Sequence, residues 1–274
     1  MPFHLMPMIA PLVLALAALF ALSRPGRRPK TVGPVLETAA LLALASTIGA
    51  GIGLALTGPA SITLFGIGDW ALTTRLDVVS VTMLLLVAFI GWIVLRYART
   101  YLDGEARQGA FLGWLAATLA TVLVLVQAGD VISFALAWIA TGLCLHRLLL
   151  FYPDRVAAQR AARKKAVTAR LGDVTVVAAM TLLASAYQST DIATILAQAA
   201  AGQGAAMVYI AAGLLALAAI LQSAQFPTHG WLTEVMEAPT PVSALLHAGV
   251  INAGGFLLIR FADVLLLAPG VLAV

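Results

Sequence analysis

Charged residues are scarce in this sequence. Asp, Glu, Lys and Arg make up 10% of its 274 residues, whereas apolar residues make up 62%. A soluble domain carries about 25% charged residues, and a tenth could not cover a water-exposed surface at this length. The chain must therefore lie mostly in lipid, where backbone groups find partners only within helices or closed barrels. At ~20 residues a span, about seven to nine spans would fit.

Cysteine and the motifs of soluble enzymes are also scarce or missing. Cys144 is the single cysteine, so no intramolecular disulfide can form. The sequence has no Walker A motif, no dinucleotide-binding glycine fingerprint and no Cys/His spacing suited to zinc or iron–sulfur. We therefore expect neither enzymatic activity nor a cofactor in this chain. No A-x-A-like cleavage signal follows the first apolar run, which we interpret as a retained span.

Apolar runs predict an all-α polytopic membrane protein with about eight transmembrane helices. The Ala/Leu-rich runs lack the two-residue alternation of an outer-membrane barrel. Gly58 and Pro59 end the second helix, and the outer loop after it contains Gly66 and Gly68. We divide the chain into helices 1–3 with their loops (1–108), helices 4–8 (109–262) and a tail (263–274). The predicted helices span residues 5–22, 35–57, 77–97, 109–128, 130–150, 172–188, 205–225 and 241–262.

The basic residues give the expected orientation. Fourteen of the 16 Lys and Arg residues fall in three regions that lie on one side of this helix map, and only Arg75 and Arg260 fall on the other. By the positive-inside rule the basic side faces the cytoplasm of a cell inner membrane, and the N-terminus lies outside. The fourteen are Arg24, Arg27, Arg28, Lys30, Arg96, Arg99, Arg107, Arg147, Arg155, Arg160, Arg163, Lys164, Lys165 and Arg170.

Two segments are expected not to span. Residues 153–170 form a basic stretch at the cytoplasmic face, and two interpretations stay open: a topology anchor, or a docking site for a soluble partner. The docking residues would be Arg163, Lys164 and Lys165. Residues 189–204 are short and weakly amphipathic, which predicts an interfacial helix or a loop.

Residues 222–255 are unusually polar for their apolar surroundings. Pro227 follows a helix of about 20 residues, and a proline there breaks or kinks the helix. Pro239 and Pro241 follow closely. Irregular backbone near membrane depth is tolerated only when it is buried in protein or lines a wet cavity, and broken helices beside ionisable groups recur in transporter ion sites. The ionisable side chains here are His229, Glu234 and Glu237.

His247 is the principal candidate for a proton path. It shares a helix face with Ser243, four residues earlier, and an imidazole can bind and release a proton near neutral pH. The alternative is a structural histidine with satisfied hydrogen bonds. Glu237 could face the same cavity or be a helix-start acid, and Glu234 could be on the path or a solvated interfacial charge. Gln222 is neutral, so it can relay water but cannot carry charge.

The run MEAPTPVSALLH, from Met236 to His247, resembles the hallmark of the proton-translocating antiporter family. That family includes the large membrane-arm subunits of respiratory complex I and the Mrp-type Na⁺/H⁺ antiporters. The resemblance implies a broken seventh helix and two inverted five-helix repeats, with residues 109–262 as the first. We expect the chain to cover the N-terminal half of a family member, as a truncated product, a fragment or one part of a split subunit.

Within the family the segment HGWLTEVMEAPTPVSALLHAGVINAGG most resembles the DabB branch, as do residues 145–149 and the 163–165 loop. That resemblance implies a subunit conducting cations, above all protons, in a complex that accumulates inorganic carbon as bicarbonate. It also implies a large soluble DabA-like partner whose zinc site hydrates CO₂. Protons or sodium ions and the lipid bilayer are the other expected partners, and nucleic acid is not.

Two departures separate the chain from the complex I relatives. Ile139 follows Trp138 where those relatives carry a glutamate, and Gln222 stands where they carry a lysine. The charged pair that would switch the half-channel is therefore absent, which favours the DabB branch. Two alternatives stay open: a subunit of a respiratory NADH:quinone oxidoreductase or Mrp-type antiporter complex, and a truncated scaffold that does not conduct.

Overall fold

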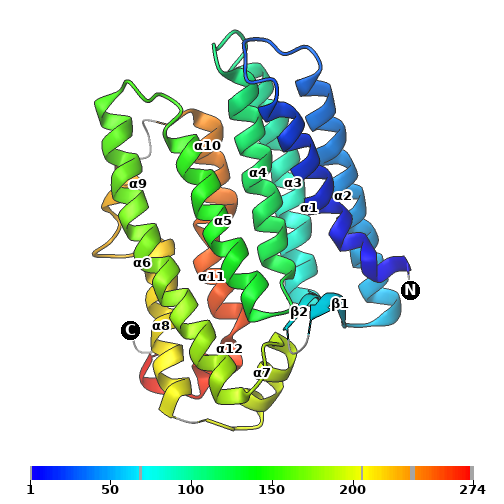
Figure 1. Cartoon of the computed structure of the whole chain (residues 1–274), viewed down its shortest axis with the longest axis vertical. Coiled ribbons are helices and arrows are strands. Elements are labelled where there is room, and N and C mark those ends of the chain that lie inside the picture. Colours follow the sequence, from blue (N-terminus) through cyan, green and yellow to red (C-terminus); the bar gives the residue numbers. More distant parts are fainter. Residues whose placement is uncertain (1, 68–69, 205, 235–237, 272–274) are drawn as a thin grey trace.

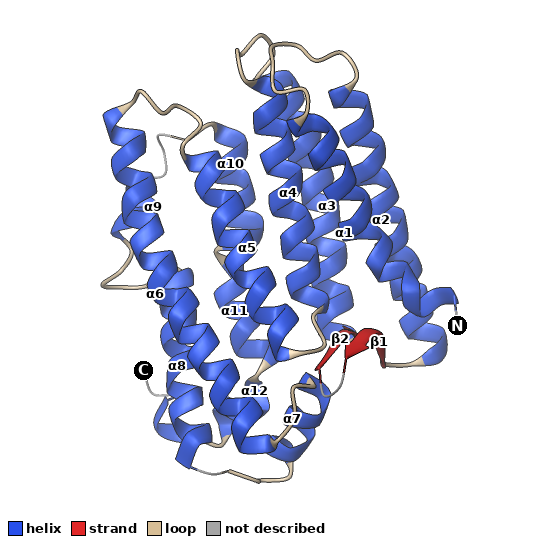
Figure 2. Ribbon diagram, in the orientation of Figure 1, coloured by secondary structure: helices blue, strands red, loops and turns tan. Residues whose placement is uncertain are grey.

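The computed structural model describes residues 2–67, 70–204, 206–234 and 238–271, and it is almost entirely helical (Figures 1 and 2). The first part comprises α1 (Pro2–Leu22), α2 (Val32–Thr57), β1 (Ala60–Ile67), β2 (Trp70–Leu76), α3 (Val78–Tyr101), α4 (Gln108–Gln127) and α5 (Val131–Leu149). The second comprises α6 (Val156–Tyr187), α7 (Ile192–Ala200), α8 (Ala206–Gln222), α9 (Gly230–Glu234), α10 (Thr240–Leu245), the π-helical η2 (Leu246–Val250), α11 (Asn252–Arg260), α12 (Ala262–Leu266) and the 3₁₀ turn η3 (Pro269–Val271).

The prediction of a polytopic helical membrane protein is confirmed. Within the described residues, α2, α3, α4, α5 and α6 are each long and apolar enough to cross a membrane. The helices α1 and α8 are also apolar but offer shorter described stretches. Of the two alternatives for residues 189–204, a helix or a loop, the structure has a short helix, α7. The Asp191 side chain caps α7 by accepting a hydrogen bond from the Thr194 amide at 2.9 Å.

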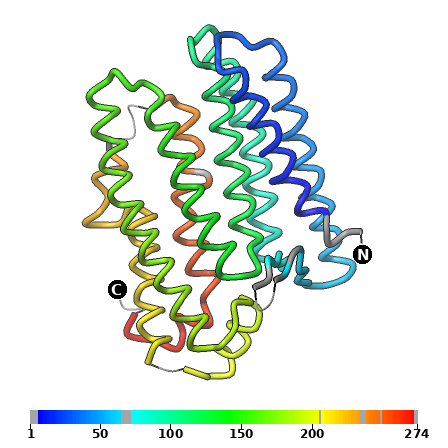
Figure 3. The backbone as a smooth tube through the Cα atoms, viewed as in Figure 1, coloured from blue at the N-terminus to red at the C-terminus, as the bar shows by residue number. Residues whose placement is uncertain are grey.

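The helices form two neighbouring groups (Figure 3). In the first, α1 packs on α2 and α4, and α3 packs on α2 and α4. In the second, α6 packs on α5 and α8, and α11 packs on α8. The last long helix, formed by α10, η2 and α11, contacts α3 through α10 and α8 through α11, so it bridges the groups. Helices distant in sequence thereby meet around this segment.

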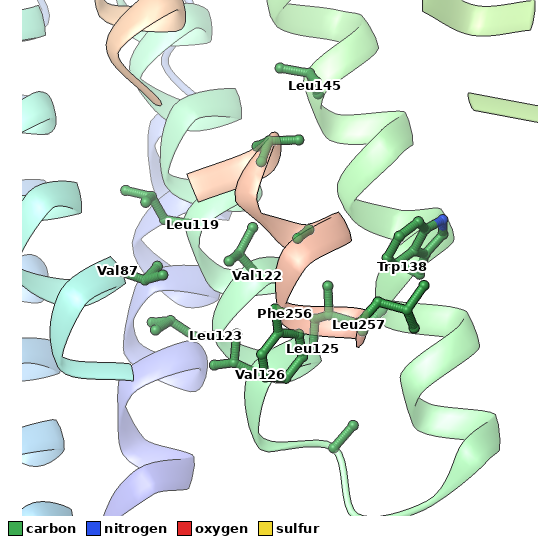
Figure 4. Close-up of a cluster of buried hydrophobic side chains, with 14 of the residues drawn as sticks. Val87, Leu119, Val122, Leu123, Leu125, Val126, Trp138, Leu145, Phe256 and Leu257 are labelled. Atoms are coloured by element: carbon green, nitrogen blue, oxygen red, sulfur yellow. The ribbon is translucent and has the colours of Figure 1, made fainter. Parts of the chain in front are cut away.

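Apolar side chains of α4, α5 and α11 fill the space between the groups (Figure 4). The Phe134 ring is the centre of an aromatic cluster: its centroid lies 6.2 Å from that of Phe256 and 5.5 Å from that of Phe261. Trp138 stacks on Phe134 from the next turn of α5. This cluster fixes α11 against α5 and so positions the last long helix.

The expected outer loop between the second and third helices is wrong in its type, because β1 and β2 pair there as an antiparallel hairpin. β-Branched residues such as Ile62, Thr73 and Thr74 favour strands. The hairpin is also held by tertiary contact: the Thr73 amide donates to Asp130 Oδ2 at 2.8 Å, and the Gly129 amide donates to the Thr73 carbonyl at 2.9 Å.

The predicted start of the sixth helix at residue 172 is also wrong, because α6 begins at Val156 and includes the basic stretch. The face formed by Ala158, Ala161, Ala162 and Ala169 is buried, and most of the basic side chains lie on the other face. The 32 residues make α6 about 48 Å long. That exceeds a hydrocarbon core of about 30 Å, so one end projects beyond it.

The loops that carry basic residues lie at one end of the bundle, and the β1–β2 hairpin lies at the other (Figure 1). Arg75 belongs to β2, and Arg260 is the last residue of α11. Both arginines contact Asp77: Arg75 Nε and Arg260 Nη1 each lie 2.6 Å from Asp77 Oδ2. Arg260 also donates to the Val126 carbonyl at 3.2 Å. Asp77 precedes the spanning helix α3 and caps it through Ser80. This network joins α3, α4 and α11.

The Asp77 carboxyl is held ionised by this network. Burial alone would raise its pKa, but the Arg260 charge and hydrogen bonds from Ser80 and the arginines outweigh burial and lower the pKa from 3.8 to about 2. A carboxyl whose pKa is lower in the folded state stabilises the fold at higher pH. Its contribution is therefore complete above about pH 4 and is lost as the pH falls toward 2.

We predict that Asp77→Asn lowers the free energy of unfolding by about 3 kcal/mol, because it leaves the buried Arg260 guanidinium without its counter-charge. The matched control is Asp103→Asn, which breaks an ion pair to Arg28 whose side chains are 56% and 67% exposed and should cost less than about 1 kcal/mol. Thermal unfolding in detergent at neutral pH compares the two. Equal shifts in melting temperature would contradict the importance of the buried network.

Candidate ion-conduction site

The expected break after the seventh predicted helix is confirmed. The helix α8 ends at Gln222, and regular helix resumes only at Gly230 in α9. The break begins before Pro227, because Ala224 adopts a left-handed conformation with φ of 52°. Such a conformation costs a residue with a side chain about 1–2 kcal/mol. The last turn of α8 is therefore complete before Pro227. The proline prevents the helix from continuing beyond the break.

A second interruption lies in the last long helix. Pro239 precedes α10, and Pro241 occupies its first turn, where the missing amide hydrogen is harmless. The helix then widens into the π-helical turn η2, which includes His247, before α11 begins at Asn252. The predicted helix over 241–262 is thus present but not regular. Single π-helical turns within α-helices occur frequently at functional sites.

The two interruptions meet. Gln222 Nε2 donates to the Val250 carbonyl at 3.0 Å, and Ser223 Oγ donates to the Ile251 carbonyl at 3.2 Å. Gly254 permits the approach, since a Cβ there would overlap Ser223 Oγ. Carbonyls at the wide turn are therefore satisfied by side chains from the end of α8.

Lys165 extends this chain of hydrogen bonds into α6. Its side chain lies inside the protein, with only 2% of the residue exposed. Lys165 Nζ donates to Gln222 Oε1 at 3.2 Å and lies 4.6 Å from the centre of the Trp231 ring of α9. The expectation that Lys165 belongs to a docking surface is therefore wrong. Arg163 and Lys164 are exposed, so that hypothesis remains applicable to them.

Two other charged groups of α6, Arg170 and Asp173, act on Lys165 through their charges and are paired with each other. Arg170 Nη1 lies 2.9 Å from Asp173 Oδ2, and the Asp173 carboxylate is almost fully buried. In the part of the chain that the structure describes, no ion pair connects Lys165 to a carboxylate. The Lys165 ammonium is therefore held by an amide oxygen and an indole ring.

The remaining predicted path residues are more dispersed. His247 is exposed on the surface of this chain, and Ser243 is half-buried. His229 is exposed and stacks on Phe226, with ring centres 5.9 Å apart. Glu234 ends α9, and Glu237 lies outside the described residues. The expected pairing of His247 with Glu237 stays a prediction.

A groove runs beside the two interruptions. It has a volume of about 350 Å³ and is lined by residues of α3, α4, the α8 break and the last long helix. Ser223, Gln225 and Asn252 contribute polar groups to its wall. A water molecule occupies about 30 Å³ in the liquid, so the groove can hold several. The polar part of its wall, formed by Ser223, Gln225 and Asn252, lies where the helices meet.

Comparison with known proteins shows which family the chain belongs to. Residues 128–273, more than half of the chain, match the family described as "NADH:quinone oxidoreductase/Mrp antiporter, TM". The chain belongs to this family. Residues 65–112 match a second family, described as "NADH-Ubiquinone oxidoreductase (complex I), chain 5 N-terminus". The resemblance based on residues 236–247 is thus confirmed, and the antiporter-like family accounts for both the broken helix and its polar stretch.

Relatives within the antiporter-like family include inorganic carbon transporter subunits. The chain is 42% identical over 201 residues to "Probable inorganic carbon transporter subunit DabB2" of Halothiobacillus neapolitanus, covering 73% of this chain and 36% of the relative. It is 37% identical over 273 residues to DabB1 of the same organism, covering 98% and 48%. The chain thus spans half or less of the length of these curated relatives.

A solved structure of an Mrp complex from Dietzia sp. has the same fold. Its matching chain superposes with a TM-score of 0.78 and 28% identity, covering 97% of this chain and 28% of the other. The antiporter-like fold expected from the sequence is therefore confirmed.

Sequence reasoning missed the burial of Lys165 because a basic run is usually solvated. A signal was nevertheless present in the spacing. Ala158, Ala161, Ala162, Lys165 and Ala169 recur every three or four residues, which places Lys165 on the face that the alanines bury.

We predict that Gln222→Leu lowers the free energy of unfolding by about 1.5–3 kcal/mol, because the buried Lys165 ammonium loses its hydrogen-bond acceptor. Gln159→Leu is the matched control: Gln159 is exposed, and its side-chain amide donates to the Pro153 carbonyl. Melting temperatures in detergent measure both. The double variant Lys165→Met/Gln222→Leu should recover the loss, and a double variant no more stable than Gln222→Leu would contradict this account.

Proposed function

We propose that this chain forms a cation-conducting part of a membrane subunit that serves inorganic carbon accumulation, with protons as the conducted ion. Relatives at 37% and 42% identity are named as inorganic carbon transporter subunits. One observation supports conduction above the others: two interrupted helices meet through side-chain hydrogen bonds within an apolar bundle. Secondary transporters build ion sites from such helices.

The proposed path follows the polar groups around these interruptions. Gln222 lies at the junction, and its amide can relay a hydrogen bond without carrying charge. The π-helical turn brings His247 to the surface of this chain. Because an imidazole facing acyl chains is costly, His247 would face a neighbouring protein segment across water. The other path residues are Ser243, Glu234, Glu237 and His229.

The proposed setting is a cell inner membrane with the basic loops in the cytoplasm and the N-terminus outside. The concentration of basic loops at one end of the bundle supports this orientation. The exposed Arg163 and Lys164 at that end would contact a large soluble DabA-like subunit with a zinc site. Inward proton flow would drive CO₂ hydration in that partner, and this chain would carry out no chemical conversion.

We predict that His247→Ala in the complete complex reduces proton flux by at least about tenfold, because the path loses its proton-exchanging group. The complex is reconstituted in liposomes that enclose a pH-sensitive dye, and cells with the variant should require elevated CO₂. Retention of the soluble partner during purification controls for assembly. Unchanged flux and normal growth in air would exclude His247 from the path.

The likeness to the Mrp structure supports a second candidate, coupled sodium/proton exchange. In the same liposomes an imposed sodium gradient distinguishes the two functions. Sodium-driven proton movement would favour the antiporter, whereas proton flux that is indifferent to sodium would favour the proposed function.

A further inference from the structure

Lys165 is a cation in an unusual place. It is the tenth residue of α6, about 14 Å along the helix axis, and its side chain is enclosed by α6, α8 and α9. Buried charges are normally paired, yet within the described part of the chain its hydrogen-bond partner is the neutral Gln222. Enclosing an ammonium away from water without a paired charge is costly, and ionisable groups in such environments cluster at functional sites.

The geometry points to Lys165 as a proton carrier of the conduction path, an inference that rests on the proposed function. A lysine can release a proton and become a neutral amine, whereas an arginine stays charged. In the release step one Nζ–H bond breaks and the proton passes to a water molecule, which leaves the amine and a hydronium ion. Reprotonation from water on the other side of the path restores the ammonium.

Gln222 connects this step to the second interruption. Its Oε1 accepts from Lys165 Nζ while its Nε2 donates to the Val250 carbonyl in the turn that carries His247. A hydrogen bond from a charged donor is roughly twice as strong as one from a neutral donor. Deprotonation of Lys165 therefore loosens Gln222, and its neighbour Ser223 lines the groove beside the two interruptions. Proton release and access to the groove are thus coupled through one amide.

A purely structural role would require different properties of the Lys165 side chain than proton transfer does. A cation that only pins α6 to α8 and α9 needs its charge and its donors, and an arginine supplies both. A proton carrier needs to lose its charge, which an arginine cannot do. The comparison of Lys165→Arg with wild type therefore separates the two roles.

The experiment measures proton flux into liposomes that contain the complete complex with wild-type chain, Lys165→Arg, Lys165→Met or Arg160→Met. We expect both Lys165 variants to lose at least about tenfold of the flux, with complex assembly and melting temperature retained. Arg160→Met replaces an exposed cation of the same helix and should conduct like wild type. Lys165→Met should fold, since an apolar side chain of similar length often stabilises a site that held a buried charge.

Flux that survives Lys165→Arg would overturn the proposal, because a fixed charge would then suffice. Should the larger guanidinium prevent assembly, Lys165→Met decides: retained flux overturns the proposal, and lost flux in an assembled complex supports it. The same experiment distinguishes failure of the proposed function from failure of this inference. If the proposed function is wrong, the wild-type complex itself shows no proton flux.

Discussion

The hydrogen bonds made by Gln222 and Ser223 hold together the two places where helices are interrupted. Lipid offers no partners to backbone groups, so every carbonyl freed by an irregular turn must be satisfied within the protein. The Val250 and Ile251 carbonyls at the π-helical turn are satisfied by the last residues of α8. The position of α11, the close packing at Gly254 and the enclosure of Lys165 all depend on this junction.

The charged residues at the two ends of the bundle differ in their exposure. At the basic end most cations are exposed, as in the Arg28–Asp103 pair, and each contributes little to stability. At the opposite end Arg260 is buried against Asp77 and the Val126 carbonyl. The exposed charges suit orientation and partner contact, whereas the buried network fixes α3, α4 and α11 relative to one another. Lys165 belongs to neither class, because it is buried without an ion pair in the described residues.

Much of the fold could be predicted because lipid imposes a simple rule on the sequence. Long apolar runs predicted the helices, and the prolines around the polar stretch predicted the break after α8. The errors fell where local pattern and tertiary contact disagree. The hairpin is stabilised by Asp130 from 57 residues away, and the basic start of α6 was interpreted as a loop because its buried alanine face is visible only against neighbouring helices.

The sequence by itself determined that the chain lies in a membrane, which loops carry the basic residues and which family its polar stretch belongs to, since each depends on composition or on contiguous residues. Only the tertiary structure decided which ionisable groups are enclosed. His247, prominent in the sequence, lies on the surface of this chain, and Lys165, one of three adjacent basic residues, lies inside. Burial depends on which helix face meets a neighbour, and neighbours such as Gln222 and Trp231 are separated from Lys165 by more than fifty residues of chain.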